Sequence, residues 1–245
     1  MALRGNTARI FLDGVDLSAT TSELSIETTT GEYDVTNLAS TLSEFRPGLN
    51  EGRININGYF HGVMSGQEEA ALYAALGASN KIVAAVFDYT SLPAPAYVIE
   101  NGSNLELSWS APTDGIFTMN GGFRGQLGVK RGLLLTYKSN KTATGLGTAV
   151  QIPGVTTGSV GRIFSFVHGI TGTQSGDITL AVQSSATGTS GWTNEATFTF
   201  PSGAGAQAAA LTTPVGPYFN INVTAMGGVT SFTTSLIITI QGLTT

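Results

Sequence analysis

The chain has 245 residues, of which 41% are hydrophobic and only 11% are charged, and its formal net charge is −5. No basic cluster is larger than Lys130-Arg131, which argues against nucleic-acid binding by counterion release because that mode needs clustered Lys and Arg. The sequence has no cysteine, which excludes disulfides and thiolate metal sites.

The composition indicates an all-β protein with many turns. The 32 glycines and the Ser/Thr-rich second half favour turns, and disorder would need low hydrophobicity with high net charge. The first residues, MALRGNTARIFLDG, lack a long apolar core, so we expect no signal peptide. The apolar runs KIVAAVF and SLIITI are far shorter than the roughly 20 residues of a membrane helix. We expect a soluble protein made in the cytoplasm, with no membrane partner.

Strands are predicted first in the N-terminal half. Asp13-Gly14 is a turn signal within ARIFLDGVDL. The runs ELSIE (residues 23–27) and RININGYF (residues 53–60) alternate apolar with polar residues, which is typical of half-buried strands.

A helix is then predicted over about residues 65–77. Ser65 and Glu68 have the spacing of a capping box. Leu72, Ala75 and Leu76 share one face, and Gly77 stands where a C-terminal glycine usually ends a helix.

Four further strands are expected in KIVAAVFDY, AYVIE, NLELSWS and GIFTMNGGF. Asn101-Gly102 lies between two of them and predicts a type I′ hairpin, since both turn positions need positive φ. This half therefore reads as a β-sandwich or open barrel with one packed helix.

A domain boundary is predicted near residues 138–147. Beyond Lys138 the only charged residues are Lys141, Arg162, Asp177 and Glu195, and the polar connector YKSNKTATGLGT lies at this change. We therefore expect domains at residues 1–138 and 139–245.

The second half contains five alternating runs bounded by Gly, Ser, Thr or Pro: GRIFSFVHGI, GDITLAVQSS, EATFTFP, YFNINVTA and FTTSLIITIQGL. Regularly spaced strands without a helix are typical of a compact antiparallel β-sandwich, Ig-like or jelly-roll-like.

No pattern of catalytic or metal-binding residues stands out. The two histidines, His61 and His168, are far apart, and we interpret His168 as a hydrogen-bonded structural residue. Asp13 and Asp16 fit turn acids better than a calcium loop. The glycine-rich segments lack the lysine of a nucleotide loop, and no G-x-S-x-G elbow is present. A carboxylate pair for glycoside cleavage stays possible on sequence alone. We expect no enzyme, cofactor or metal.

Surface contacts are the remaining candidates. Trp192 and Tyr218 could form an aromatic platform for a sugar or a partner, and the alternative is that both are aromatics at the rim of the sandwich. A second concentration of polar residues is TLSEFRPGLNEGRININGYFHG, which contains Glu44, Arg46, Glu51 and Arg53.

This region carries a family resemblance. The segments DGVDLS, YDVTNLAS and EFRPGL, the last leading into INING, and the following EEAALYAALG resemble tail-tube (major tail) proteins of siphophage-type bacteriophages and related virion proteins. The match covers roughly residues 8–125. The second half resembles domains that such proteins display outward.

The resemblance implies a β-sandwich with a flanking helix. Subunits would join edge to edge in six-membered rings that stack into a tube for DNA, together with other phage tail proteins. DNA would pass as a repelled cargo, and the protein would be located in the virion tail. The loop at about residues 30–52 would pack on the neighbouring ring.

The assembly role falls on six residues of that loop: Asp34, Thr36, Phe45, Arg46, Pro47 and Gly48. Phe45 would be buried at the contact, Arg46 would pair with an acid of a neighbour, and Pro47-Gly48 would form a turn. The charges of EFRPGL would thus face another subunit, and this loop would lead into the strand RININGYF. A solvated hairpin is the alternative.

Two other functions remain open from the sequence. A capsid decoration or cement protein would also be acidic, rich in β-structure and free of cysteine. A carbohydrate- or receptor-binding virion module would use Trp192 and Tyr218.

Overall fold

The computed structural model describes residues 7–34, 45–59, 67–125, 127–212 and 214–241, without the side chains of 32–34, 45–50, 67, 104 and 105. The fold over these ranges is mainly β, as predicted, and α1 (Gln67–Ala75) is the helix within them. This helix is too short to cross a membrane.

The chain forms two compact units. One comprises Met1–Ser18, Ala84–Tyr97 and Arg131–Thr245, and is called the sandwich unit; the other comprises Ala19–Val83 and Val98–Lys130, and is called the arm unit. The units interleave along the sequence, whereas the predicted domains, 1–138 and 139–245, are continuous. That domain division stays a prediction.

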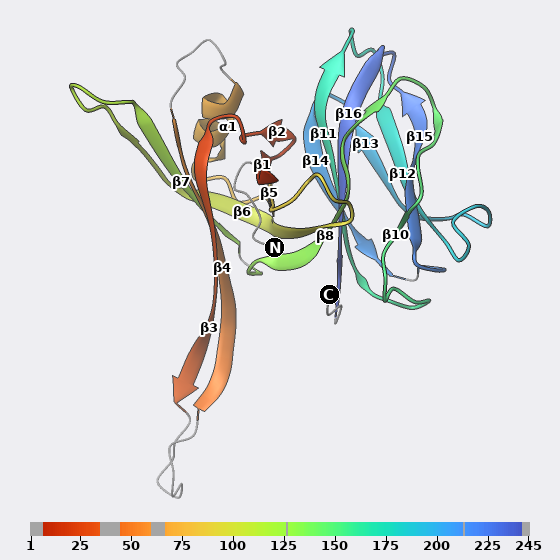
Figure 1. Ribbon diagram of the computed structural model, residues 1–245, viewed down its shortest axis with the longest axis horizontal. Coiled ribbons are helices and arrows are strands. Elements are labelled where there is room, and N and C mark those ends of the chain that lie inside the picture. The colour runs from red at the N-terminus through yellow and green to blue at the C-terminus, as the bar shows by residue number, and fades with distance from the viewer. Residues whose placement is uncertain (1–6, 35–44, 60–66, 126, 213, 242–245) are drawn as a thin grey trace, which may run out of the picture. The chain divides into compact units, whose positions relative to one another are not determined.

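The sandwich unit has two antiparallel layers (Figure 1). One layer has the order β14-β11-β16-β8, and the other has the order β10-β15-β12-β13 with β9 beside β15. Their bounds are β8 Lys130–Lys141, β9 Gly145–Leu146, β10 Val150–Gln151, β11 Gly161–Thr171, β12 Ile178–Ser185, β13 Thr193–Phe200, β14 Gly205–Leu211, β15 Tyr218–Met226 and β16 Ser231–Ile240. The five predicted runs are all strands. β14 was not predicted, because GAQAAAL does not alternate.

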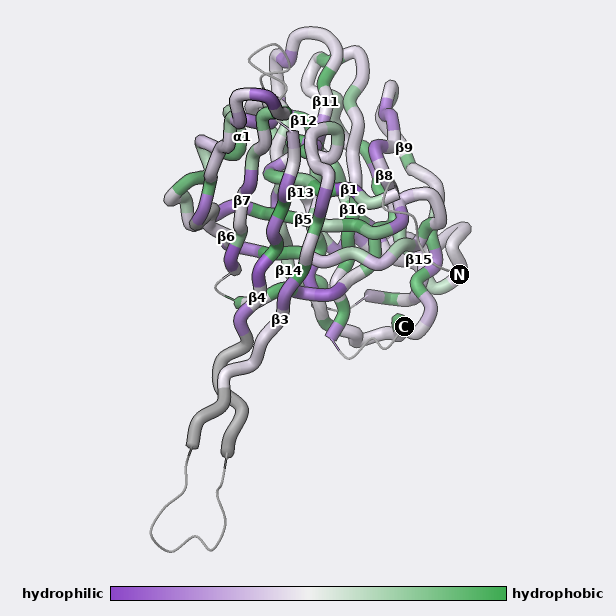
Figure 2. The backbone as a smooth tube through the Cα atoms, turned by 60° about the vertical axis from the view of Figure 1, so that its left-hand side comes forward, coloured by the Kyte–Doolittle hydropathy of each residue, from purple (hydrophilic) through white to green (hydrophobic). Residues whose placement is uncertain are grey.

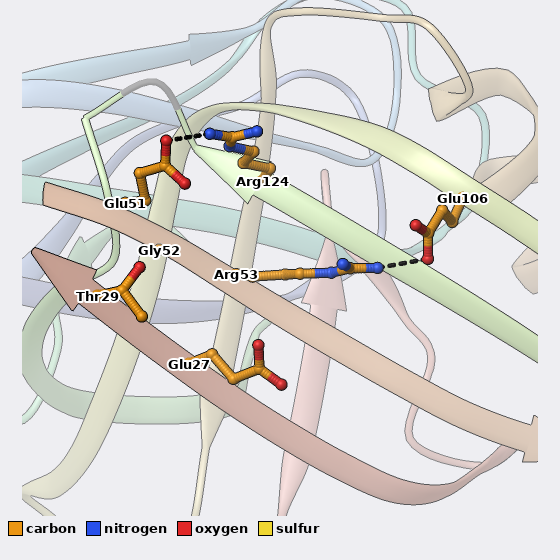
Figure 3. A pocket seen from close by; sticks show the side chains of 7 residues that line it. All are labelled: Glu27, Thr29, Glu51, Gly52, Arg53, Glu106 and Arg124. Carbon is orange, nitrogen blue, oxygen red and sulfur yellow. Dashed lines mark hydrogen bonds and ion pairs between the residues drawn. The ribbon is translucent and has the colours of Figure 1, made fainter. Parts of the chain in front are cut away.

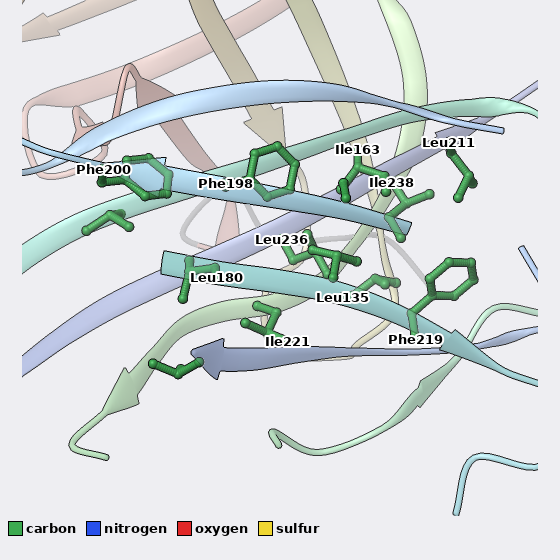
Figure 4. Close-up of a cluster of buried hydrophobic side chains, with 14 of the residues drawn as sticks. Leu135, Ile163, Leu180, Phe198, Phe200, Leu211, Phe219, Ile221, Leu236 and Ile238 are labelled. Carbon is green, nitrogen blue, oxygen red and sulfur yellow. The ribbon is translucent and has the colours of Figure 1, made fainter. Parts of the chain in front are cut away.

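The alternation of apolar and polar residues along the strands explains how the two layers are held together. Inward side chains of both sheets form one apolar core (Figure 4), and removing this surface from water is the main stabilising contribution. The largest members are Phe198, Phe200, Phe219 and Phe232, all at most 3% exposed.

The N-terminal hairpin consists of β1 (Arg9–Leu12) and β2 (Val15–Asp16). Leu12 pairs with Val15, and both intervening residues have positive φ, 46° at Asp13 and 89° at Gly14. Two positive φ values define the two-residue turn that the sequence predicts.

The arm unit is built on an antiparallel sheet in the order β3-β4-β7-β6. The bounds are β3 Thr21–Asp34, β4 Phe45–Tyr59, β6 Ala94–Ser110 and β7 Thr118–Gly125, and β5 is Lys81–Val86. Polar and apolar residues alternate over RINING in β4 (Figure 2). Ile54, Ile56 and Phe123 are at most 3% exposed, which confirms that the apolar positions of the predicted half-buried strand RININGYF face inward at Ile54 and Ile56.

The helix confirms its prediction in part. Leu72 and Ala75 are fully buried, and Gly77 has a φ of 74°, which is the left-handed conformation of a helix-ending glycine. Leu76 differs, because it is 46% exposed. The predicted cap, Ser65, lies outside the described residues.

The predicted hairpin at Asn101-Gly102 is wrong. β6 runs from Ala94 to Ser110 without reversing. Asn101 has a φ of 55°, but Gly102 does not share the positive φ, so one residue of the pair bends the strand. Gly102 is needed for space instead, since a Cβ there would lie 2.6 Å from Cγ2 of Ile99.

Candidate functional site

The outward face of the arm-unit sheet is polar in every described row. Register places Glu23, Asn57, Asn120 and Ser108 in one row; Ser25, Asn55, Gly122 and Glu106 in the next; and Glu27, Arg53, Arg124 and Ser103 in a third. Side chains of one face project on the same side because strands have a period of two. We call this surface the polar face.

Two ion pairs cross the polar face (Figure 3). Nη2 of Arg53 donates to Oε2 of Glu106, and Nη2 of Arg124 donates to Oε1 of Glu51. Gly122 makes the first pair possible, because a Cβ at that position would lie 2.6 Å from Nη2 of Arg53. The guanidinium therefore lies across the backbone of β7.

The paired side chains line a shallow hollow of about 330 Å³. Its lining residues are Glu27, Thr29, Glu51, Gly52, Arg53, Glu106 and Arg124. Asn55 donates to Oε1 of Glu27 over 3.3 Å, and Asn57 donates to Oε2 of Glu23 over 2.8 Å. The polar face carries four carboxylates, Glu23, Glu27, Glu51 and Glu106, against the two guanidinium groups of Arg53 and Arg124. The face is therefore net acidic, and each guanidinium is paired with a carboxylate.

These pairs involve two charged residues of the stretch that leads into RININGYF. Glu51 and Arg53 pair with Arg124 and Glu106 of the same chain. The partners are 73 and 53 residues away, so no local pattern identifies them.

The predicted assembly residues lie on a two-stranded ribbon. Over the described residues, β4 pairs with β7 from Gly52 to Tyr59, whereas the pairing of β3 with β4 continues to Asp34 opposite Phe45. The ribbon beyond Gly52, formed by residues 28–34 and 45–51, is called the arm. Figure 1 shows it extending past the other strands of the arm unit.

Register places the predicted residues along this arm. Arg46 is opposite Tyr33, and Pro47 is opposite Glu32 next to a register shift. Pro47 and Gly48 thus lie inside β4 and not in the predicted turn, because proline is tolerated at edges and irregularities of a sheet. Thr36 lies outside the described residues. The assembly role of all six residues stays a prediction.

The two candidate surface aromatics belong to the sandwich unit. Trp192 precedes β13 and Tyr218 begins β15, and both are half-buried. A Cβ on Gly188 would lie 2.7 Å from Cδ1 of Tyr218, so the tyrosine ring lies directly on the backbone of that loop. Their contact role stays a prediction.

His168 is a hydrogen-bonded structural residue, as predicted. Its Nδ1 is 2.9 Å from the carbonyl oxygen of Gly14, and its Nε2 is 2.9 Å from Oγ of Ser235. A serine, a histidine and a carbonyl in this order resemble a nucleophile with its base. Ser235 is fully buried and its Oγ also accepts the Lys138 N–H, so a substrate has no access to it. His61 lies outside the described residues.

Titration of this buried cluster reflects its surroundings. Burial lowers the pKa of His168 to about 4. Burial opposes ionisation of Asp16, but hydrogen bonds from Lys138 and Ser18 outweigh it and hold the pKa below 3.8. Over the described residues, no three His, Asp or Glu side chains gather as a metal site would require.

Comparisons with known proteins give fold similarities only. No family model matches the chain, and no curated protein matches it. Among solved structures, it is similar to a chain in the virion of a native gene transfer agent particle, with 13% identity over 53% of this chain and 98% of that chain, at a TM-score of 0.41.

Two further structures illustrate the range. The tube-terminating cap of the anti-feeding prophage has 12% identity over 54% of this chain and 91% of that chain, at a TM-score of 0.39. The Dit protein of phage SPP1, described as a hub adsorption apparatus, has 7% identity over 95% of this chain and 98% of that chain, at a TM-score of 0.34. Similarities at these identities and TM-scores concern the fold alone.

Proposed function

We propose that this chain is a non-enzymatic structural protein of a phage-type virion tail. It self-associates through the arm unit into stacked rings, and the expected ring has six subunits. The stack forms the tail tube through which DNA is ejected, in contact with other tail proteins. The protein is made in the host cytoplasm and resides in the virion.

The arm is the observation that carries this proposal. A two-stranded ribbon is marginally stable in water by itself, and pairing between β3 and β4 continues over the whole arm without a third strand among the described residues. Such a ribbon gains most by packing on another surface. A second copy of the chain is the partner that a stacked assembly supplies, and the sequence resemblance includes this same segment.

The edge of β3 supports lateral association. β3 is 14 residues long and, within the described residues, pairs with β4 alone. Long open edges are normally shortened, covered or used for pairing with another chain. Joining this edge to a neighbouring subunit would extend the sheet around a closed ring.

The polar face supports a passage for DNA. It is net acidic, and both of its arginines are engaged by carboxylates of the same chain. A phosphate backbone is therefore repelled by the face and meets no unpaired guanidinium on it. In the proposed ring this face lines the interior.

Assembly by the purified chain tests the proposal. We expect rings or tubes of the wild-type chain in negative-stain micrographs. Arg46→Glu should leave the circular dichroism spectrum and the unfolding midpoint unchanged and abolish tubes, because it reverses the charge offered to the neighbour. Arg131→Glu is the matched control, since it makes the same charge change at an exposed position of the sandwich unit and should assemble normally.

Normal-length tubes from the Arg46→Glu variant would contradict the role of the arm. Wild-type monomers that coat preformed capsids would instead favour a decoration protein.

A further inference from the structure

The β1–β2 hairpin is closely fitted against the sandwich unit. Phe11 is fully buried, and its ring centroid lies 4.7 Å from that of His168 and 5.7 Å from that of Phe166. At the turn, a Cβ on Gly14 would lie 2.4 Å from the carbonyl oxygen of Val167 and 2.6 Å from the nitrogen of Gly205. The turn of the hairpin is thus in direct contact with β11 and with the start of β14.

Hydrogen bonds define which form of His168 this contact accepts. The carbonyl oxygen of Gly14 can only accept, so Nδ1 carries the proton. Ser235 Oγ already accepts the Lys138 N–H, which leaves its own proton for Nε2. Every donor then has an acceptor when the imidazole is neutral. A second proton, on Nε2, would turn this nitrogen from an acceptor into a donor, and the Ser235 hydroxyl proton would lose its acceptor.

The charged groups around His168 give an imidazolium no net support, because Lys138 lowers the pKa of His168 more than Asp16 raises it. Asp16 of β2 is occupied by Nζ of Lys138 on β8, at 2.6 Å. Arg9 of β1 donates to the hydroxyl of Tyr137, which also faces Asp16. β16 and β14 contribute no titratable residue, as their sequences SFTTSLIITI and GAQAAAL show. The second carboxylate near the turn, Asp13, is itself engaged.

The backbone explains why this histidine points at the hairpin. The pairing of β11 with β16 shifts register between Val167 and Ile170, so His168 lies at a β-bulge. Bulges re-aim side chains. The bulge therefore directs the imidazole toward the Gly14 carbonyl.

We propose that His168 is an acid-sensitive clasp, which holds the β1–β2 hairpin on the sandwich unit while neutral and weakens that docking when protonated. This inference does not depend on the proposed tail function. It assigns a defined role to a buried titratable group that assembly does not use.

The sign and size of the effect follow from linkage. When the hairpin is docked, His168 has a pKa of about 4, whereas an exposed imidazole has an ordinary pKa of about 6.5. The undocked state therefore binds protons more readily between these values, and docking is fully stable above pH 6.5 and weakens as pH falls toward 4. At pH 5 the ratio of undocked to docked hairpin should rise about 30-fold over its value at pH 7.5.

Hydrogen exchange at the two pH values tests the clasp. After correction for intrinsic rates, we expect protection of residues 9–17 to fall about 30-fold from pH 7.5 to pH 5.0, while protection of β12 changes little. In His168→Gln, which cannot be charged, the pH dependence of residues 9–17 should disappear. An equal fall in β12 and in the hairpin would overturn the proposal.

A second measurement covers the case in which the variant fails to fold. The wild-type chain has only two histidines, His61 and His168, so the imidazole proton signals can be assigned with a His61→Gln variant. The His168 signal should titrate well below pH 6. Titration near pH 6.5 in the folded protein would also refute the clasp.

Discussion

Single glycines show how closely backbone segments approach in this protein. Gly14 has both a positive φ and no room for a side chain. Gly203 has nearly the same φ, 92°, but nothing lies within 4 Å of its potential Cβ. Substitutions at Gly14 and Gly203 therefore separate the free-energy cost of an unfavourable φ from the free-energy cost of a steric clash.

The prediction at this scale compares Gly14→Ala with Gly203→Ala. The control should lose about 1–2 kcal/mol from its left-handed backbone alone. Gly14→Ala should lose at least about 2 kcal/mol more, because its methyl group overlaps backbone atoms that cannot move away. Urea unfolding monitored by circular dichroism measures both. Equal losses would show that the turn is not closely packed.

At the scale of elements, one side chain protects part of an edge of the second sandwich sheet. β13 is the last strand of that sheet, so its outer backbone groups need partners. Gln207 of β14 accepts from the N–H of Thr199 and donates to its carbonyl oxygen. One amide side chain thus takes the place of a neighbouring strand.

The prediction for this element concerns Gln207→Ala. Losing two hydrogen bonds at a half-buried edge should cost about 1–2 kcal/mol. It should also increase aggregation, because the freed edge can pair with another chain. Gln151→Ala, at an exposed position of β10, is the control and should change neither. Urea midpoints and light scattering on warming measure the two effects, and stability equal to that of the control would contradict the role of Gln207.

At the scale of the whole molecule, the low charge content determines how the protein interacts with a polyanion such as DNA. The net charge is −5, and the arginines of the polar face are held by Glu51 and Glu106. Such exposed pairs contribute little to stability. Their main effect is on the electrostatic field that the face presents.

Removing these two carboxylates should therefore expose the arginines. A Glu51→Gln, Glu106→Gln double variant should bind a short DNA duplex at low salt, with affinity that falls as salt rises, whereas the wild-type chain should not bind. The control, Asp114→Asn with Asp177→Asn, changes the net charge equally at two exposed positions. Fluorescence anisotropy of labelled DNA measures binding. Equal behaviour of the two double variants would mean that net charge acts, and not the ion pairs.

The amino-acid sequence alone determined those features that depend on residues close together along the chain. Alternation placed the strands around Ile54 and Ile56, and the turn at Asp13-Gly14 and the glycine after α1 follow from the φ values that only some residues adopt easily. The assembly hypothesis also came from the sequence, through a resemblance.

Tertiary structure decided which residues meet. Asn101-Gly102 has the composition of a hairpin turn, yet β6 continues through it and Gly102 pairs with Gly125 of β7. The ion pairs of the polar face depend on the order β3-β4-β7-β6, and the contact of His168 with Gly14 spans 154 residues. Sheet order and register are set by the burial of whole strands against one another, so the composition of a short segment cannot specify these contacts.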